Sequence, residues 1–263
     1  MIYKYIAAAA ALAISIPSIC LASPIPLNAA SAPMIQEDGI PSLFEKRAAG
    51  EIITTCTVAN SFAVTFDDGP SIWTHELLDY LAIKRVKVTF FVNGLNYNSI
   101  KDPAISAVVK RAFDEGHQIA SHTWSHADIS LPSTNLDNEM GLLDSALKDI
   151  IGVRPTYMRP PYGNTSPAAV EWLTTRGYKV VNWNIDTNDW QHPLDFKSDF
   201  AGYSAVLQNP AAQGKTFISL QHDAEQGTAQ VFSKLAIEYV LSKGFNIMPV
   251  GACLGDTSGW YRQ

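Results

Sequence analysis

The chain has 263 residues, of which 47% are hydrophobic and 17% are charged, and its formal net charge at pH 7 is −6. This composition is typical of one globular domain that buries its own core, and it excludes a collagen-like or intrinsically disordered chain. An acidic balance without basic tracts also argues against a nucleic-acid partner.

The N-terminus, residues 1–22, has the layout of a secretory signal peptide. Lys4 precedes an apolar run, residues 6–14, and a small-residue stretch follows that ends at Ala22. Cleavage after Ala22 fits this pattern best. A membrane anchor is the alternative, but the run is far shorter than the roughly 20 residues that span a bilayer. We therefore expect a secreted protein, extracellular or in the cell wall, without a membrane partner.

Residues 23–47 are rich in Pro, Ala and Ser and end in the dibasic pair Lys46-Arg47. We interpret them as a propeptide or linker that is cut at this pair, and a flexible N-terminal arm with two incidental charges is the alternative. The expected folded domain then comprises residues 48–263. It keeps the net charge of −6, because residues 1–47 contain as many acidic as basic side chains.

Cysteine usage points to a single disulfide. Cys20 leaves with the signal peptide, and Cys56 and Cys253 remain near opposite ends of the folded domain. In an oxidising compartment this pair is expected to form one disulfide that ties the termini together. Two buried free thiols are the alternative, which export of the chain disfavours.

From residue 60 onward, β-rich apolar segments alternate with helical segments, and a glycine repeatedly separates a helix from the next strand. This punctuation is typical of alternating helix and strand units. The expected strands cover residues 62–66, 86–92, 117–121, 153–158, 178–183, 216–220 and 245–250. The expected helices cover residues 74–84, 103–115, 135–150, 166–176, 198–208 and 228–242.

About seven strands in this order favour an α/β fold with parallel strands, a distorted and incomplete (β/α) barrel, over an open doubly wound sheet. The first strand is not followed by the glycine fingerprint of a dinucleotide-binding sheet, which supports the same choice.

Clusters of polar residues follow the expected strands. They are residues 67–70, 121–126, 159–164, 186–190 and 221–223. The carboxyl ends of parallel barrel strands form one face, and such folds assemble their active sites there. Structural polar residues would have no reason to share that face, so we expect the clusters to form one site.

His122 and His126 are four residues apart, so on a helical turn both imidazoles face one way and can bind one cation. This spacing alone is weak evidence, because two surface histidines would produce it too. Asp67 and Asp68 adjoin at a strand end and point to opposite sides, so only one of them is expected to bind the metal. Two histidines and one carboxylate form a catalytic zinc-type site, whose bound water has a pKa of about 7.

A hydrolase that cleaves an acyl group also needs a base for the water proton, an acid for the leaving atom and donors for the oxyanion. The aspartate that does not bind metal suits the base. His222, late in the chain and flanked by apolar strand residues, suits the acid. A buried structural histidine or a surface histidine is the alternative for His222.

Together the clusters resemble the motifs of the polysaccharide deacetylases, the NodB-homology domain of carbohydrate esterase family four. The resemblance covers most of residues 60–250 and implies a distorted (β/α) barrel. It implies that Asp67 is the catalytic base and that His222 is the general acid. The implied ligands of a divalent metal, zinc with cobalt as the alternative, are Asp68, His122 and His126.

The resemblance also implies supporting roles. Arg159 would orient the base, Asp186 would tune the acid histidine, and the backbone N–H of Tyr162 would donate to the oxyanion. Trp190 and Leu220 would form a small apolar pocket for the acetyl methyl group. Without the resemblance, a surface salt bridge for Arg159 and core packing for the two apolar residues would be the simpler interpretations.

Chitin, peptidoglycan and acetylated xylan are substrates in this family. A signal peptide, a dibasic junction and one terminal disulfide resemble the secreted fungal chitin deacetylases most closely. The resemblance therefore implies that domain 48–263 hydrolyses the N-acetyl groups of chitin or chitin oligomers, as a monomer. Acetylxylan esterase and peptidoglycan deacetylase activities are the alternatives within the same chemistry.

Two further alternatives belong to other functional classes. A glycoside hydrolase could use Asp67 and Asp68, but adjacent residues seldom hold two carboxylates about 5 Å or more apart across a sugar ring. A catalytically silent carbohydrate-binding barrel would not need the complete set of acid, base and metal-ligand candidates.

Overall fold

The structure is a computed structural model that describes residues 50–192 and 194–263. The expected signal peptide, residues 1–22, and the expected propeptide, residues 23–47, lie outside the described residues. In the part of the chain that the structure describes, no helix has the length and apolar character needed to cross a membrane.

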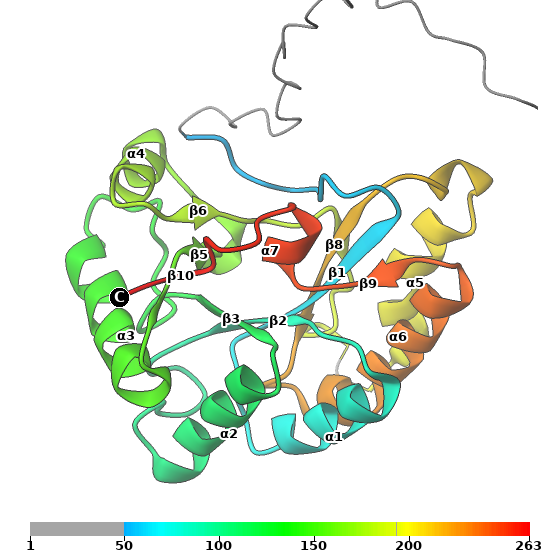
Figure 1. Ribbon diagram of the computed structural model, residues 1–263, viewed down its shortest axis with the longest axis horizontal. Coiled ribbons are helices and arrows are strands. Elements are labelled where there is room, and N and C mark those ends of the chain that lie inside the picture. Colours follow the sequence, from blue (N-terminus) through cyan, green and yellow to red (C-terminus); the bar gives the residue numbers. More distant parts are fainter. Residues whose placement is uncertain (1–49, 193) are drawn as a thin grey trace, which may run out of the picture. The chain divides into compact units, whose positions relative to one another are not determined.

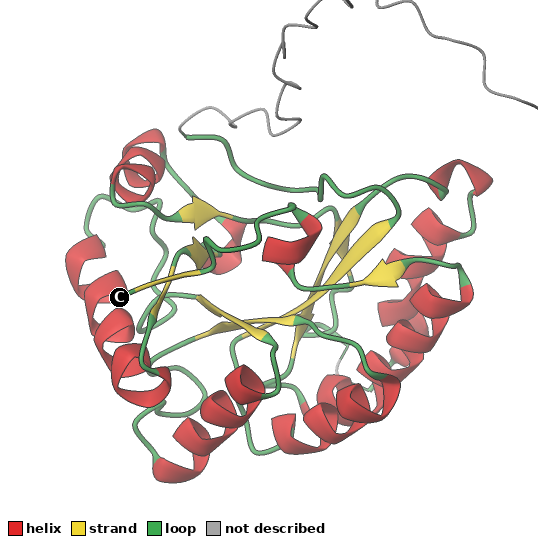
Figure 2. Cartoon of the chain, viewed as in Figure 1, coloured by secondary structure: helices red, strands yellow, loops and turns green. Residues whose placement is uncertain are grey.

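A sheet of parallel strands forms the centre of the fold (Figure 2). Its strands are β1 (Ser61–Asp67), β2 (Thr89–Val92), β3 (Gln118–Ser121), β5 (Tyr157–Met158), β6 (Lys179–Val180), β7 (Ile185–Asp186), β8 (Phe217–His222) and β9 (Asn246–Ile247). The main path runs β6-β5-β3-β2-β1-β8-β7, and β9 pairs with the start of β1. Among the described strands, β6 and β7 end this path without pairing with each other. The expected distorted, incomplete (β/α) barrel is confirmed.

Helices α1 to α6 form an arc around the outside of the strands (Figure 1). The helices are α1 (Thr74–Lys84), α2 (Pro103–Asp114), α3 (Leu136–Ile151), α4 (Pro167–Thr175), α5 (Phe196–Leu207), α6 (Ser233–Ser242), α7 (Val250–Cys253), the 3₁₀ turns η1 (Pro161–Gly163) and η2 (Pro210–Ala212), and the π-helical η3 (Thr228–Phe232). Asp102, Asn135 and Ser166 each cap a helix start, because their side chains accept a hydrogen bond from a first-turn N–H.

The expected elements differ from the observed ones in a few places. The expected strand 153–158 is interrupted: β4 (Arg154–Pro155) pairs antiparallel with β10 (Tyr261–Arg262), and only β5 joins the central sheet. Pro155 has no N–H to donate to a central ladder, which explains the break. Strand β7 was not expected, because two residues are too few for a periodic pattern. The expected helix 228–242 begins as η3 and continues as α6.

Every residue of β1 is buried, and the two faces of the strand pack against different parts of the core. Phe62, Val64 and Phe66 face the helices and belong to the large outer core. Ala63 belongs to a second cluster, inside the barrel. Side chains alternate along a strand, so Asp67 lies on the inner face with Ala63. This alternation aims the last residue of β1 into the barrel mouth.

Helix α7 lies at the amino-terminal end of the strands. Its Val250 N–H donates to Thr89 Oγ1 at 2.9 Å, and its Gly251 N–H donates to Gln118 Oε1 at 2.8 Å. Thr89 and Gln118 are the first residues of β2 and β3. The barrel is therefore closed by α7 at the end opposite the strand carboxyl ends.

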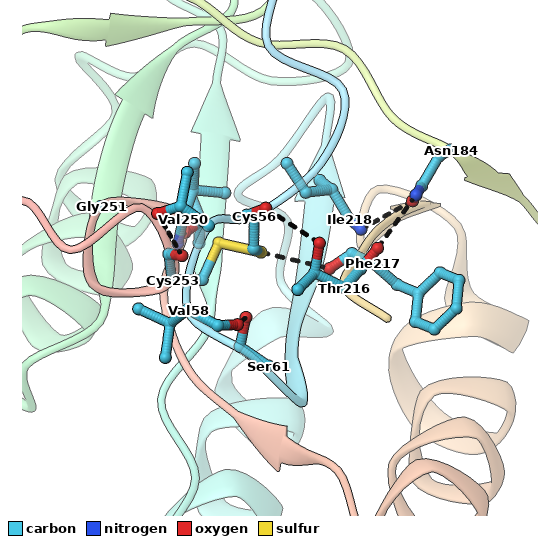
Figure 3. The surroundings of a disulfide bond; sticks show 12 residues. Cys56, Val58, Ser61, Asn184, Thr216, Phe217, Ile218, Val250, Gly251 and Cys253 are labelled. Atoms are coloured by element: carbon cyan, nitrogen blue, oxygen red, sulfur yellow. Dashed lines mark hydrogen bonds between the residues drawn. A yellow bond between two sulfur atoms is a disulfide. The ribbon is translucent and has the colours of Figure 1, made fainter. Parts of the chain in front are cut away.

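The expected disulfide is confirmed at this closed end (Figure 3). It joins Cys56, which precedes β1, to Cys253 of α7, and their Cα atoms are 5.1 Å apart. Both cysteines are buried. Thr216 Oγ1, just before β8, donates a hydrogen bond of 2.9 Å to the carbonyl oxygen of Cys56. The disulfide thus ties the first described segment to the end of the chain, away from the strand carboxyl ends.

Candidate active site

Five of the predicted site residues lie at the carboxyl ends of neighbouring parallel strands. Asp67 ends β1 and His222 ends β8, and the two are partners in the parallel register. Asp68, His122 and Arg159 directly follow β1, β3 and β5. Because parallel strands end at one edge of a sheet, residues far apart in the sequence come together here.

Asp68, His122 and His126 form a cluster that could hold a metal ion. One ligand atom of each residue lies within 4.8 Å of the others. Asp68 Oδ1 is 3.3 Å from His126 Nε2 and 3.6 Å from His122 Nε2. Both imidazoles therefore direct a nitrogen toward the same carboxylate oxygen.

The protonation states suit a cation. Burial lowers the pKa of His126 to about 4 and moves the pKa of His122 well below its ordinary value, so both imidazoles are neutral at neutral pH. His122 Nδ1 lies 2.8 Å from the carbonyl oxygen of Arg159, to which it donates, so its Nε2 lone pair stays free. Burial raises the pKa of Asp68 to about 6, and a bound cation would lower it again. Two neutral nitrogens and one carboxylate fit a zinc-type divalent metal.

The expected helical turn between the two histidines is wrong. Residues 122–126 lie in a loop after β3, and His126 and Thr123 have positive φ values of 58° and 69°. Asn93, directly after β2, shapes this loop: its Nδ2 donates to the carbonyl oxygens of His122 and Thr123 at 2.5 and 3.0 Å. The histidines share one face because this loop folds back, which periodic spacing could not predict.

Asp67 has a different environment from its neighbour Asp68. Arg159 Nη1 donates to Asp67 Oδ1 at 2.7 Å, and Asp67 Oδ2 is 3.7 Å from His122 Nε2. Arg159 is fully buried, and its guanidinium lies 4.2 Å from the centroid of the Phe91 ring. Burial raises the pKa of Asp67, and the charge of Arg159 counteracts part of this rise. One oxygen of Asp67 is thus held by Arg159 while the other faces the metal-ligand cluster.

His222 pairs with Asp189, so the predicted pairing with Asp186 is wrong. His222 Nδ1 is 2.7 Å from Asp189 Oδ1, and the His222 backbone N–H donates to Asp189 Oδ2 at 2.7 Å. Thr228 Oγ1 also donates to Asp189 Oδ2 at 2.7 Å. Burial alone lowers the pKa of His222, but the hydrogen bond and charge of Asp189, with the charges of Asp67 and Asp68, raise it to about 9.

The strand register explains the correction. Asp186 is the partner of Leu220, so it falls two residues short of the level of His222. The carboxylate of Asp186 instead accepts hydrogen bonds from Trp183 Nε1 at 3.1 Å and from the Asn188 N–H at 2.9 Å. The chain must continue beyond β7 to reach His222, and Asp189 lies on that continuation. Both aspartates stand in the predicted cluster 186–190, so only the register distinguishes them.

The residues predicted to bind the acetyl group surround the same end of the barrel. Leu220 is buried in β8, two residues before His222 and therefore on the same face of the strand. Tyr162, at φ 61°, is 64% exposed, and its ring packs edge-on against His126 with centroids 4.6 Å apart. Trp190, next to Asp189, is 55% exposed. Their roles in substrate binding stay predictions.

A separate apolar hollow of about 540 Å³ lies between α5 and α6. It is lined by Phe196, Lys197, Phe200, Leu235, Glu238, Tyr239 and Ser242. None of the predicted site residues lines it, and no histidine is among its lining residues. The chemistry of the strand carboxyl ends therefore marks the better candidate site.

The chain is similar to proteins of one family. The family model described as polysaccharide deacetylase matches residues 54–181. A chitin deacetylase of Pestalotiopsis sp is 48% identical over 217 residues, which cover 81% of this chain and 70% of that protein. A probable peptidoglycan-N-acetylglucosamine deacetylase of Arthroderma benhamiae is 40% identical over 81% of this chain and 48% of that protein. The structure of a chitin deacetylase from Colletotrichum lindemuthianum matches with a TM-score of 0.76 at 32% identity, over 81% of this chain and 96% of that chain.

Proposed function

The chain belongs to the polysaccharide deacetylase family, and on that premise we propose that it hydrolyses the N-acetyl groups of GlcNAc residues in chitin or chitin oligomers. It is an amide-hydrolysing deacetylase, and its products would be acetate and chitosan. The observation that supports the proposal is that three structural features lie together at the carboxyl ends of the strands. These are a three-residue metal-ligand cluster, a buried carboxylate held by an arginine, and a histidine whose pKa is raised to about 9.

Asp68, His122 and His126 would hold the divalent metal, zinc with cobalt as the alternative. When bound, such a cation acts as a Lewis acid toward the acetyl carbonyl and lowers the pKa of a water molecule at the site. The chain contributes a neutral nitrogen from each histidine and one carboxylate. The contact of His122 Nδ1 with a backbone carbonyl fixes the ring orientation before the metal arrives.

Asp67 is the proposed general base. It would take the proton of the attacking water at Oδ2, the oxygen that faces His122, while Oδ1 stays bound to Arg159. Because its pKa is raised by burial, Asp67 is a better proton acceptor than an exposed aspartate. Arg159 keeps the carboxylate in one orientation during the transfer.

His222 is the proposed general acid. Its Nδ1 is held by Asp189, so Nε2 is the atom that would give a proton to the leaving nitrogen. A pKa of about 9 keeps the imidazole protonated at neutral pH. The leaving nitrogen takes this proton as the C–N bond breaks, which releases the free amine of the sugar and leaves the acetyl group with the water oxygen as acetate. The Tyr162 backbone N–H would donate to the oxyanion, and Trp190 and Leu220 would enclose the acetyl methyl group.

The glycoside hydrolase alternative is disfavoured by the geometry of its two carboxylates. Asp67 is paired with Arg159, and Asp68 lies beside two histidines, so neither is placed as a free acid or nucleophile across a sugar ring. Acetylxylan and peptidoglycan would be handled by the same machinery. The choice of chitin rests on the similarity to fungal chitin deacetylases.

The proposed mature enzyme comprises residues 48–263 and is secreted as a monomer to the cell exterior or cell wall. The predicted signal peptide, residues 1–22, and the predicted propeptide, residues 23–47, support this proposal. The disulfide between Cys56 and Cys253 is consistent with an oxidising compartment.

One experiment tests the proposed function. The purified protein is incubated with acetylated chitin oligomers, acetylated xylan oligomers and peptidoglycan fragments, and the loss of acetyl groups is followed by mass spectrometry. We expect the chitin oligomers to lose acetyl groups, the loss to stop with a chelator, and zinc or cobalt to restore it. Release from xylan alone would reassign the substrate, and chain cleavage that ignores the chelator would refute the deacetylase mechanism.

A further inference from the structure

Asp223 is a fully buried aspartate directly after His222 that has no part in the mechanism above. The pairing between β1 and β8 ends at Asp67 and His222, so Asp68 and Asp223 are the first residues outside the sheet. Asp68 has a positive φ of 69°, and the chain leaves the strand direction there. The sheet therefore fixes the proposed base and acid, but it does not fix the proposed metal ligand Asp68.

Hydrogen bonds that Asp223 accepts join the two segments beyond the last pair of the sheet. Thr74 Oγ1 donates to Asp223 Oδ2 at 2.5 Å, and Ser71 Oγ donates to the Asp223 carbonyl oxygen at 2.8 Å. The Ser71 N–H donates to Thr74 Oγ1 at 2.9 Å. Ser71, Thr74 and Asp223 are all buried, so these bonds are shielded from water. The loop after β1 is thus attached to the residue that follows the proposed acid.

Gly69 shows how closely the two segments approach. A Cβ at this position would lie 2.2 and 2.4 Å from the two carboxylate oxygens of Asp223, well inside van der Waals contact. The φ of Gly69 is not in the left-handed region. Glycine is therefore needed at this position because a Cβ has no room, and not because of the backbone conformation. The carboxylate of Asp223 therefore packs against the backbone next to Asp68.

Only one of the two carboxylate oxygens of Asp223, Oδ2, accepts a hydrogen bond from the described residues. Asp223 Oδ1 accepts no hydrogen bond from the residues that the structure describes. An incompletely paired buried carboxyl group destabilises a fold, so its presence at this position calls for a role. Contact with Gly69 on one side and Thr74 on the other is consistent with a role in holding the loop.

We propose that Asp223 is a positioning residue that clamps the loop of Asp68, Gly69 and Pro70 against the end of β8 and so sets the metal-ligand geometry. This inference rests on the proposed function, because it takes Asp68 to be a metal ligand. Asp223 would touch neither metal nor substrate. It acts through Gly69 and Thr74, and the affinity of the site for zinc is the property that it controls.

The test is a double-mutant cycle read by zinc binding. Gly69→Ala, Asp223→Ala and the double variant are prepared as full chains, and zinc is titrated into each metal-free protein. We expect Asp223→Ala to weaken zinc binding by about 10-fold to 100-fold, the usual range for residues that orient a metal ligand. Gly69→Ala should weaken it as much or more, because its Cβ meets the carboxylate. In the double variant this collision is absent, so its affinity should match that of Asp223→Ala alone.

Three further variants separate positioning from general damage to the fold. Gly141→Ala, on α3, places a Cβ where nothing lies within 4 Å and should leave zinc affinity unchanged. Thr74→Val removes the hydrogen bond but not the shape, and it should weaken zinc binding even if Asp223→Ala folds poorly. Asp223→Asn keeps an acceptor for Thr74 and should recover most of the affinity. Thermal unfolding without metal shows which variants are folded.

The outcomes separate this inference from the proposed function, because zinc titration needs no substrate. Wild-type zinc affinity in folded Asp223→Ala or Thr74→Val would overturn the clamp. A double variant weakened by the product of the two single effects would also overturn it, since the collision would then involve another group. A wild-type protein that binds zinc but leaves chitin oligomers intact would instead refute the proposed substrate.

Discussion

Replacement of Asp189 by Asn tests the assignment of the acid most directly. The change keeps the size of the side chain but removes the charge that lies 2.7 Å from His222 Nδ1. The pKa of His222, now raised to about 9, should fall toward its ordinary value of 6.5. His222 must be protonated to act as an acid, so the alkaline limb of the pH profile of kcat/KM should move down by the same interval.

The size of the effect follows from the two pKa values. At pH 8, His222 is about 90% protonated with a pKa of about 9 and about 3% protonated with a pKa of 6.5, so activity should fall by up to about 30-fold. At pH 6 both forms are mostly protonated, and the loss should be much smaller. The raised pKa of His222, to which Asp189 contributes most and the charges of Asp67 and Asp68 contribute the rest, stabilises the fold by up to about 3 kcal/mol. Since the pKa of His222 is raised on folding, this stabilisation is complete below pH 6.5 and is lost as the pH rises through about 9.

The assay is acetate release from a chitin oligomer between pH 5 and pH 10, with thermal unfolding measured at the same pH values. Asp186→Asn is the matched control, because Asp186 bonds to Trp183 and Asn188 and not to His222. An alkaline limb that stays in place in Asp189→Asn, or that moves in Asp186→Asn, would refute the assignment.

The remaining predictions concern the base, the metal and the disulfide. Asp67→Asn should lower kcat at least about 100-fold while zinc affinity in a titration stays near that of the wild type, because Asp67 is proposed to be the base and not a ligand; comparable loss of zinc would reverse the proposed roles of Asp67 and Asp68. His126→Ala should lose both zinc and activity, and metal analysis beside the activity assay checks this. Zinc at about 1,000 times its Kd should raise the free energy of unfolding by about 4 kcal/mol, measured by thermal or denaturant unfolding, and the rise should vanish in His126→Ala. Reduction of the Cys56–Cys253 disulfide should lower the Tm, with about 5 kcal/mol as the upper figure for a loop with a separation of 197 residues. Activity at 25 °C should persist after reduction, because the disulfide lies at the closed end of the barrel; its loss in a protein that is still folded would contradict this.

Short-range patterns in the sequence were enough to predict the barrel and the strand ends that carry the polar clusters. The cysteine pair followed from the cysteine count, because only Cys56 and Cys253 remain once Cys20 is assigned to the signal peptide. Glycines after helices and the alternation of apolar and helical segments are properties of nearby residues, and they act before any tertiary contact exists. The motif resemblance then singled out Asp68, His122 and His126, which the structure brings within ligand distance. Their binding of metal stays a prediction.

Only the tertiary structure decided which aspartate contacts His222, the proposed acid, and why His122 and His126 share a face. Asp186 and Asp189 lie in one short cluster, and the register of β7 against β8 places Asp189, not Asp186, beside His222. The histidine loop is shaped by Asn93 from another strand, and the need for Gly69 arises from the carboxylate of Asp223. Each of these contacts, including the one between Asp189 and His222, joins residues about 30 or more positions apart in the chain. Local periodicity carries no information on such pairings, because they exist only once the strands have been aligned.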